Sequence, residues 1–103
     1  MNFADNLNAL LEIAGKRVRL HDVHGVECGV IENAPGTGGS FRVYAELIQR
    51  YGSITSEAAV AGVTLFAEHA EDARQHPGKH PNIDRLFVCI DTQTRLDASI
   101  ECD

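Results

Sequence analysis

The sequence lacks the features that mark several common protein classes. It has no apolar run near the roughly 20 residues that a membrane span requires, and no basic region leads into an apolar stretch at its start. It also has no internal repeat, no low-complexity tract and no charge block typical of a linker. We therefore expect a single domain over 1–103, in a soluble cytoplasmic protein with no membrane contact.

Paired cysteines are missing as well. Cys28, Cys89 and Cys102 are too widely separated for a C-x-x-C pair, the spacing that delivers two thiolates to one zinc ion. The pattern favours buried, reduced thiols in strands. A reactive thiol is the alternative, with Cys102 as its candidate because it lies next to the C-terminus.

Positive charge is scarce. Nine Lys and Arg residues stand against fifteen Asp and Glu residues, which gives a net charge of -6. The local basic cluster at Lys16, Arg17 and Arg19 lacks the interleaved aromatic residues expected of single-strand binders. Binding to nucleic acid is therefore unlikely on charge alone.

The residues that are present predict an α+β fold. Apolar positions share one helical face over 3–14, and Gly15 can end that helix. Apolar residues then alternate with polar ones, which predicts a hairpin near 16–33 with a two-residue turn at His24 and Gly25.

The middle of the chain is predicted to be mainly helical. Helical spacing indicates helices over 40–51 and 55–61, and a third over 70–76. The residues at 63–67 are ambiguous: they continue the second helix if Gly62 lies inside it, or they form a short buried strand. Their β-branched and aromatic content favours the strand.

The last third of the chain predicts a second hairpin near 86–102. Residues 86–90 form a continuous apolar run typical of a buried strand, and alternation predicts a final strand with Leu96, Ala98, Ile100 and Cys102 facing inward. Hairpins at both ends and helices between them predict a mostly antiparallel sheet with the helices packed on one face.

A glycine-rich loop precedes the helix predicted at 40–51. Backbone N–H groups at a helix N-terminus can hold an anion, which makes Gly38, Gly39, Ser40 and Arg42 candidate anion-binding or nucleotide-binding residues. The loop departs from the familiar phosphate motifs, since Phe41 stands where G-x-G-x-x-G needs its third glycine. A structural loop is the other interpretation.

The segment 66–86 holds three of the five histidines of the chain. Helical spacing stacks several imidazoles and carboxylates along one stripe, the ligand mix that suits zinc, iron or manganese. The candidate metal ligands are His69, Asp72, His76 and His80, and the candidate general bases for a metal-bound water are Glu68 and Glu71. Alternatively, the segment is a capped turn locked by its own hydrogen bonds, or a polar surface that binds a partner.

The run AEHxEDARxxPGKHPNIDRL at 67–86, together with Asp5-Asn6-Leu7 and Pro35-Gly36, resembles the signature of a small bacterial family catalogued as a domain of unknown function. The likeness extends from Phe3 to about Ile90. It implies a bacterial cytoplasmic protein and supplies no activity, ligand or catalytic residue.

Three functions follow from these observations. The favoured hypothesis is a noncatalytic binding or assembly domain that acts through a protein partner or by self-association, because the sequence contains no complete catalytic constellation. The first alternative is a metal-dependent hydrolase that uses the cluster at 68–84. The second is an anion or nucleotide binder at 36–42.

Overall fold

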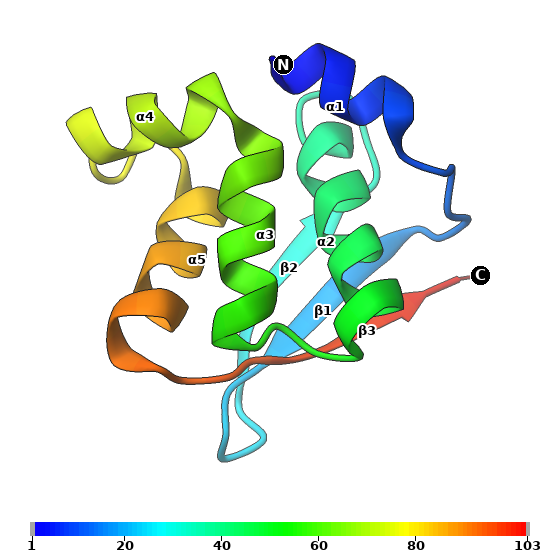
Figure 1. Ribbon diagram of the computed structural model, residues 1–103. Coiled ribbons are helices and arrows are strands. Elements are labelled where there is room, and N and C mark those ends of the chain that lie inside the picture. The colour runs from blue at the N-terminus through cyan, green and yellow to red at the C-terminus, as the bar shows by residue number, and fades with distance from the viewer. Residues whose placement is uncertain (1, 103) are drawn as a thin grey trace.

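The structure is a computed structural model that describes residues 2–102. Helices and a small sheet share one core, so the α+β class is confirmed (Figure 1). In chain order the elements are α1 (Phe3–Ala9), β1 (Arg17–His21), β2 (Glu27–Glu32), α2 (Gly38–Tyr51), α3 (Ser56–Phe66), α4 (Glu68–Gln75), α5 (Pro81–Thr92) and β3 (Asp97–Glu101).

The sheet is antiparallel, with strand order β2-β1-β3. Side chains of a strand point alternately to its two faces, and in β1 this places Val18 and Leu20 in the core while Arg17 and Arg19 stay partly exposed. The helices lie on the buried side of the sheet (Figure 1). The predicted arrangement, helices on one face of a mostly antiparallel sheet, is therefore confirmed.

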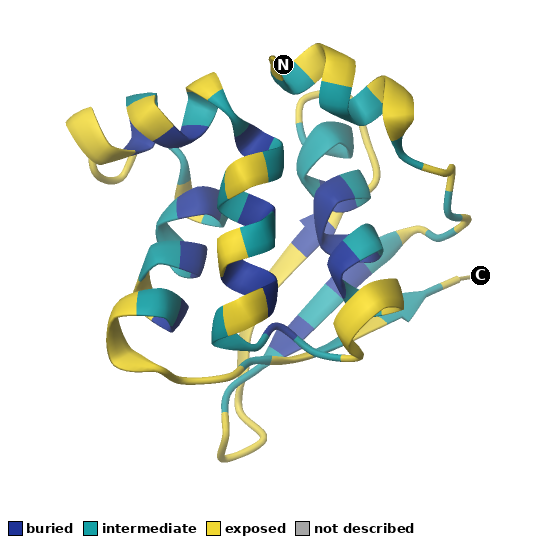
Figure 2. Cartoon of the chain, viewed as in Figure 1, coloured by how far each residue is buried: buried dark blue, intermediate teal, exposed yellow. Residues whose placement is uncertain are grey.

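Helix α2 supplies the centre of the core. Phe41, Tyr44 and Leu47 recur on one of its faces and are fully buried. Figure 2 shows the buried residues gathered where α2, α3 and α5 meet each other and the sheet. The helices predicted at 40–51 and 70–76 are confirmed as α2 and α4.

Helix α3 corrects the prediction for 63–67. The predicted strand is wrong, because α3 extends from Ser56 to Phe66 with Gly62 inside it. A Cβ atom on Gly62 would lie 2.8 Å from Leu86 Cδ1 and 2.9 Å from Leu47 Cδ1. The glycine lets α3 approach α2 and α5 closely, and this packing offsets the cost of about 1 kcal/mol for glycine within a helix.

Helix α5 corrects the prediction for 86–90. The predicted strand and the hairpin over 86–102 are wrong, because residues 86–90 lie within α5 and β3 pairs with β1 instead. Proline is favoured in the first turn of a helix, and Pro81 starts α5 there. Ile83, Leu86 and Cys89 then form its buried face at helical spacing.

Helix α1 ends earlier than the predicted 3–14. It stops at Ala9, and a guanidinium nitrogen of Arg42 donates to the carbonyl oxygens of Leu7 at 2.7 Å and Leu10 at 3.4 Å. A longer helix would use those carbonyl groups for its own hydrogen bonds. The contact with Arg42 therefore replaces the last turns of the predicted helix.

The first hairpin is confirmed, but its turn is longer than predicted. Gly25 N donates to Asp22 O at 3.0 Å, and Asp22 N donates to Val26 O at 2.9 Å, so three residues separate the paired positions. Gly25 has φ of +79°, the left-handed conformation that such three-residue turns place at glycine. The predicted two-residue turn at His24 and Gly25 is wrong.

The cysteine environments differ from the prediction of buried thiols in strands. Cys89 is buried but lies in α5, while Cys28 of β2 and Cys102 after β3 are exposed. All three thiols are free. Within residues 2–102, none of the helices combines the length and apolarity needed to cross a membrane.

Candidate functional site

The segment 66–86 folds into the end of α3, helix α4, a tight turn and the first part of α5. Gly78 has φ of +93° in the turn, and its N–H donates to Asp84 Oδ2 at 2.9 Å. Further along, the Tyr44 hydroxyl donates to the carbonyl oxygen of Asn82 at 2.6 Å. These bonds fix the start of α5 against both α2 and the turn.

Asp72 lies at the centre of a polar group that we call the Asp72 cluster, formed by Asp72, His76, Lys79 and His80. Asp72 Oδ2 lies 2.6 Å from His80 Nε2 and 2.9 Å from Lys79 Nζ. Asp72 Oδ1 lies 3.8 Å from His76 Nε2. The hydrogen bond with His80, and then that with Lys79, lower the pKa of Asp72 from 3.8 to about 2.

The other predicted site residues of this segment contact different partners. The His69 ring packs edge-on against the Phe3 ring at 4.9 Å and lies 5.8 Å from the His80 ring, measured between centroids. Glu68 Oε1 accepts a hydrogen bond from Phe3 N at 2.7 Å, and Glu71 accepts one from Gln75. Hydrogen bonds from its own amide and from Phe3 N hold the pKa of Glu68 below its usual value.

The structure brings some of the predicted metal ligands together and gives others different partners. Asp72 and His80 are in direct contact, whereas Lys79 shares the Asp72 oxygen that His80 also contacts. Over residues 2–102, no group of three or more His, Cys, Asp or Glu side chains is arranged to hold a metal ion. Metal binding through His69, Asp72, His76 and His80 stays a prediction.

The glycine-rich loop leads directly into α2. Thr37 Oγ1 donates to the Glu32 carbonyl at 2.7 Å and so leaves the α2 N-terminus without a side-chain cap. Gly38 N donates to Ala34 O at 2.7 Å. Of the predicted anion-binding residues, Gly38, Gly39 and Ser40 lie in the first turn of α2. Arg42 instead contacts α1.

One cavity of about 650 Å³ joins the two polar segments. Its walls are formed by the loop 34–40, the segment 79–83, Phe3 and Leu7 of α1, and Phe66 and His69 from the end of α3 and the start of α4. Gly39 and His80 thus line the same space, although they are far apart in the sequence. The walls combine apolar side chains with Lys79 and two imidazoles.

The sequence interpretation missed the contribution of α1 to this cavity. The sequence predicts only that Phe3 belongs to an apolar helical face, but its ring stacks on the Phe66 ring at 5.4 Å and forms part of the wall. A Cβ atom on Gly39 would lie 3.1 Å from Phe3 Cζ. The apolar face of α1 predicts that this helix packs against the rest of the chain, but it does not indicate which residues it contacts.

The backbone is strained beside the cavity. Ala67 joins α3 to α4 with φ of +53° and ψ of -119°, a region that residues with a Cβ atom rarely occupy. Its neighbours Phe66 and Glu68 contact Phe3, through its ring and its amide respectively. Strain of this kind clusters at functional sites.

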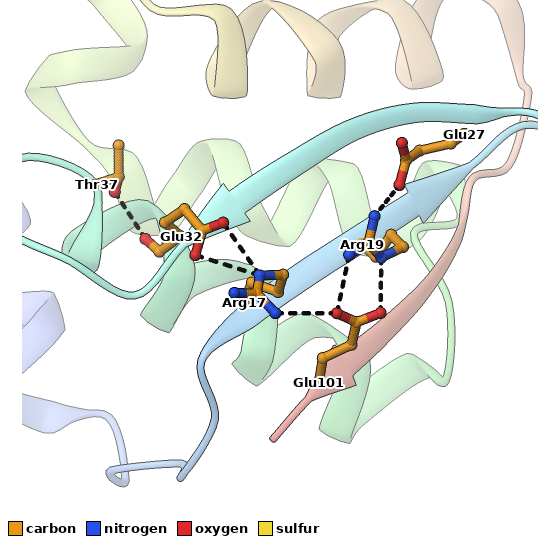
Figure 3. Close-up of polar contacts among 6 residues, drawn as sticks. All are labelled: Arg17, Arg19, Glu27, Glu32, Thr37 and Glu101. Atoms are coloured by element: carbon orange, nitrogen blue, oxygen red, sulfur yellow. Dashed lines mark hydrogen bonds and ion pairs between the residues drawn. The ribbon is translucent and has the colours of Figure 1, made fainter. Parts of the chain in front are cut away.

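A second polar group lies on the uncovered face of the sheet. This sheet cluster consists of Arg17, Arg19, Glu27, Glu32 and Glu101 (Figure 3). Glu101 accepts hydrogen bonds from Arg19 at 2.6 Å and from Arg17 at 3.3 Å, and these bonds lower the pKa of Glu101 from 4.5 to about 2. Arg17 also binds Glu32, and Arg19 binds Glu27.

The architecture defines the chain as an α+β domain in which a cavity lies between the glycine-rich loop and the start of α5. The chain belongs to a bacterial family described as "Uncharacterized protein conserved in bacteria (DUF2322)", whose model matches residues 3–100. The match confirms the resemblance carried by the run at 67–86. No curated protein and no solved structure matches the chain.

Proposed function

We propose that this chain is a noncatalytic binding domain whose ligand occupies the cavity. One observation carries the proposal: segments 34–40 and 79–83, which the sequence singles out separately, line a single cavity. Its volume of about 650 Å³ lies within the range of about 300 to 1,000 Å³ that small-molecule sites have. Walls that are mainly apolar, with a few polar groups, are also typical of such sites.

The contacts of the titratable side chains support binding in preference to catalysis. Asp72 holds Lys79 and His80, and Glu68 holds the amide of Phe3. These carboxylates therefore have structural roles that position the cavity walls. A nucleophilic mechanism would need a hydroxyl or thiol activated by a base. Of the two hydroxyls on the wall, that of Thr37 donates to the Glu32 carbonyl, and within residues 2–102 no hydrogen bond joins that of Ser40 to a histidine or carboxylate.

A protein partner, self-association and a cytoplasmic location stay predictions. The sheet cluster gives a partner surface little support, because Arg17 and Arg19 already donate to carboxylates of their own chain. The metal-dependent hydrolase also stays a prediction. The contact of Lys79 with Asp72 gives it little support, because a metal ion bound to that oxygen of Asp72 would have to displace the ammonium group.

A fragment screen on the whole chain, read by amide chemical shifts, tests the proposal. We expect the fragments that bind to shift the signals of Gly36, Gly39 and His80 together, because these residues line the cavity. The substitution Gly39→Leu should abolish these shifts, since even a Cβ atom there lies 3.1 Å from the Phe3 ring. Gln49→Leu adds the same side chain to an exposed position of α2 and should leave them unchanged.

The proposal fails if no fragment shifts these signals in the unsubstituted chain. It also fails if the fragments bind but their shifts map to the sheet cluster. A fragment that still shifts the signals of Gly36 and His80 in folded Gly39→Leu protein would count against the cavity as the site.

A further inference from the structure

We infer that the ligand of the cavity is a small organic anion: an oxyanion head, carboxylate or phosphate, attached to an apolar body. The inference rests on the proposed function and adds the chemical class of the ligand. It follows from the charges, the apolar walls and the free backbone donors of the cavity.

The charge of the cavity walls is opposite in sign to that of the chain. The chain carries fifteen acidic residues against nine Lys and Arg, a net charge of -6. Among the described residues that line the cavity, Lys79, His69 and His80 are the titratable ones, and none is Asp or Glu. In a protein this acidic, a cavity free of carboxylates favours an anion over a cation.

Asp72 positions the basic groups from outside the cavity wall. It contacts Lys79 Nζ at 2.9 Å and His80 Nε2 at 2.6 Å, but it does not line the cavity itself. One carboxylate therefore orients both side chains at the cavity wall. The Lys79 ammonium group has three N–H bonds, so it can keep its contact with Asp72 and still donate a charge-assisted hydrogen bond to an oxyanion.

Backbone donors lie on the opposite wall. Within residues 2–102, the N–H groups of Gly39 and Ser40 donate no hydrogen bond to the chain, and Thr37 provides no side-chain cap. These groups lie in the first turn of a helix of 14 residues, where the helix dipole favours negative charge. They add donors to a cavity whose basic side chains already favour an anion.

The remaining walls require an apolar part of the ligand. Phe3, Leu7, Phe66 and Ile83 contribute side chains without polar atoms. A bare inorganic anion would leave these walls in contact with water, so an aromatic or aliphatic body adds free energy of binding by covering them. Phenyl phosphate and benzoate have the expected chemistry in its smallest form.

The test measures dissociation constants by titrating the whole chain and following the amide signals of Gly36, Gly39 and His80. We expect phenyl phosphate or benzoate to bind at least about tenfold more tightly than neutral benzamide, because only the anions accept charge-assisted hydrogen bonds. Benzylamine, a cation, should bind more weakly than benzamide. Inorganic phosphate should bind at least about tenfold more weakly than phenyl phosphate, because it lacks the apolar body.

A pair of charge variants identifies the donor. Lys79→Gln should weaken binding of the preferred anion by about tenfold. Arg95→Gln removes one positive charge of nearly equal exposure, 58% against 59%, outside the cavity walls, and should change binding by less than about twofold. If Lys79→Gln does not fold, the comparison of the anions with benzamide and benzylamine on the unsubstituted chain still decides the test.

Three results overturn the inference while leaving the proposed function intact. The first is that benzamide or benzylamine has a dissociation constant as low as those of both anions, measured on the cavity signals. The second is inorganic phosphate binding as tightly as phenyl phosphate. If fragments bind in the cavity but neither anion does, the inference fails alone. If no compound of any charge shifts the cavity signals, the inference and the proposed function fail together.

Discussion

Asp72 and Glu101 use the same chemistry in two different regions. Each carboxylate holds two basic side chains, Lys79 and His80 for Asp72, Arg17 and Arg19 for Glu101, and each pKa falls to about 2. The sheet cluster joins neighbouring strands (Figure 3), and its side chains are partly exposed. The Asp72 cluster adjoins a cavity whose walls include both of its main partners. The two clusters differ in the surroundings of the carboxylate. The sheet cluster links strands to one another, whereas the Asp72 cluster adjoins a proposed binding site.

The largest expected difference is in stability, when an apolar residue is shortened either on the cavity wall or on the open face of the sheet. Ile83 lines the cavity and is 2% exposed, whereas Val30 lies opposite Arg19 in the sheet and is 40% exposed. Ile83→Ala should lower the free energy of unfolding by about 3 kcal/mol, because it removes buried methyl groups and leaves a void. Val30→Ala should lower it by about 0.5 kcal/mol or less.

Urea denaturation of both variants measures this difference. Equal losses in the two variants would contradict it, since they would mean that the cavity wall is no better packed than the open face of the sheet.

The strained link beside the cavity predicts a gain in stability. Replacing Ala67 by glycine should raise the free energy of unfolding by about 1 kcal/mol, because glycine adopts φ of +53° with ψ of -119° without a Cβ clash. Gln93 ends α5 with φ of +55° and ψ of +33°, an ordinary left-handed conformation. Gln93→Gly is the control and should give no gain, because it also removes the hydrogen bonds of the Gln93 side chain with Ile90 O and Ser56 Oγ.

Thermal unfolding of the two glycine variants checks this prediction. A loss of stability in Ala67→Gly would show that the backbone at Ala67 is not strained. If the same variant also weakens ligand binding, the strain contributes to the shape of the cavity.

Acid should weaken both clusters, with a smaller effect. The pKa of Glu101 falls from 4.5 to about 2 and that of Asp72 from 3.8 to about 2 on folding. A carboxylate whose pKa is lower in the folded state stabilises the fold fully above its unfolded pKa, and this contribution is lost as the pH falls toward the folded value. Both carboxylates are partly exposed, so each loss should be modest.

Urea midpoints between about pH 5 and pH 2.5 measure these losses. Glu101→Gln and Asp72→Asn should each flatten the decline seen in the unsubstituted chain. Only Asp72→Asn should also shift the amide signals of Gly39 and His80, which line the cavity. Matching effects of Glu101→Gln on those signals would mean that the two clusters are not independent.

Much of the fold could be predicted from local patterns. The long amphipathic helix α2 repeats its apolar positions over several turns, and the alternation of β1 separates its buried residues from its arginines. Residues 86–90 misled the interpretation because a short apolar run has no period of its own. The helical spacing becomes visible when Ile83 is included, because Leu86 and Cys89 follow it on one face.

The cavity could not be predicted because it depends on contacts between distant segments. Spacing in the sequence relates His76 to His80, but nothing in it relates His80 to Gly39 or to Phe3. These residues meet because α3 packs against α5 and because α1 packs against α2 and α3. The sequence therefore indicated the polar segments separately, as a candidate metal site and a candidate anion site, and their shared cavity appears only in the structure.

The most direct test of a single ligand site built from both segments is a set of nuclear Overhauser effects from bound phenyl phosphate. We expect its ring protons to give contacts to the methyl groups of Ile83 and to the Gly39 amide within one complex, because both residues line the cavity. Contacts to Val30 on the open face of the sheet, with none to Ile83 or Gly39, would contradict the account.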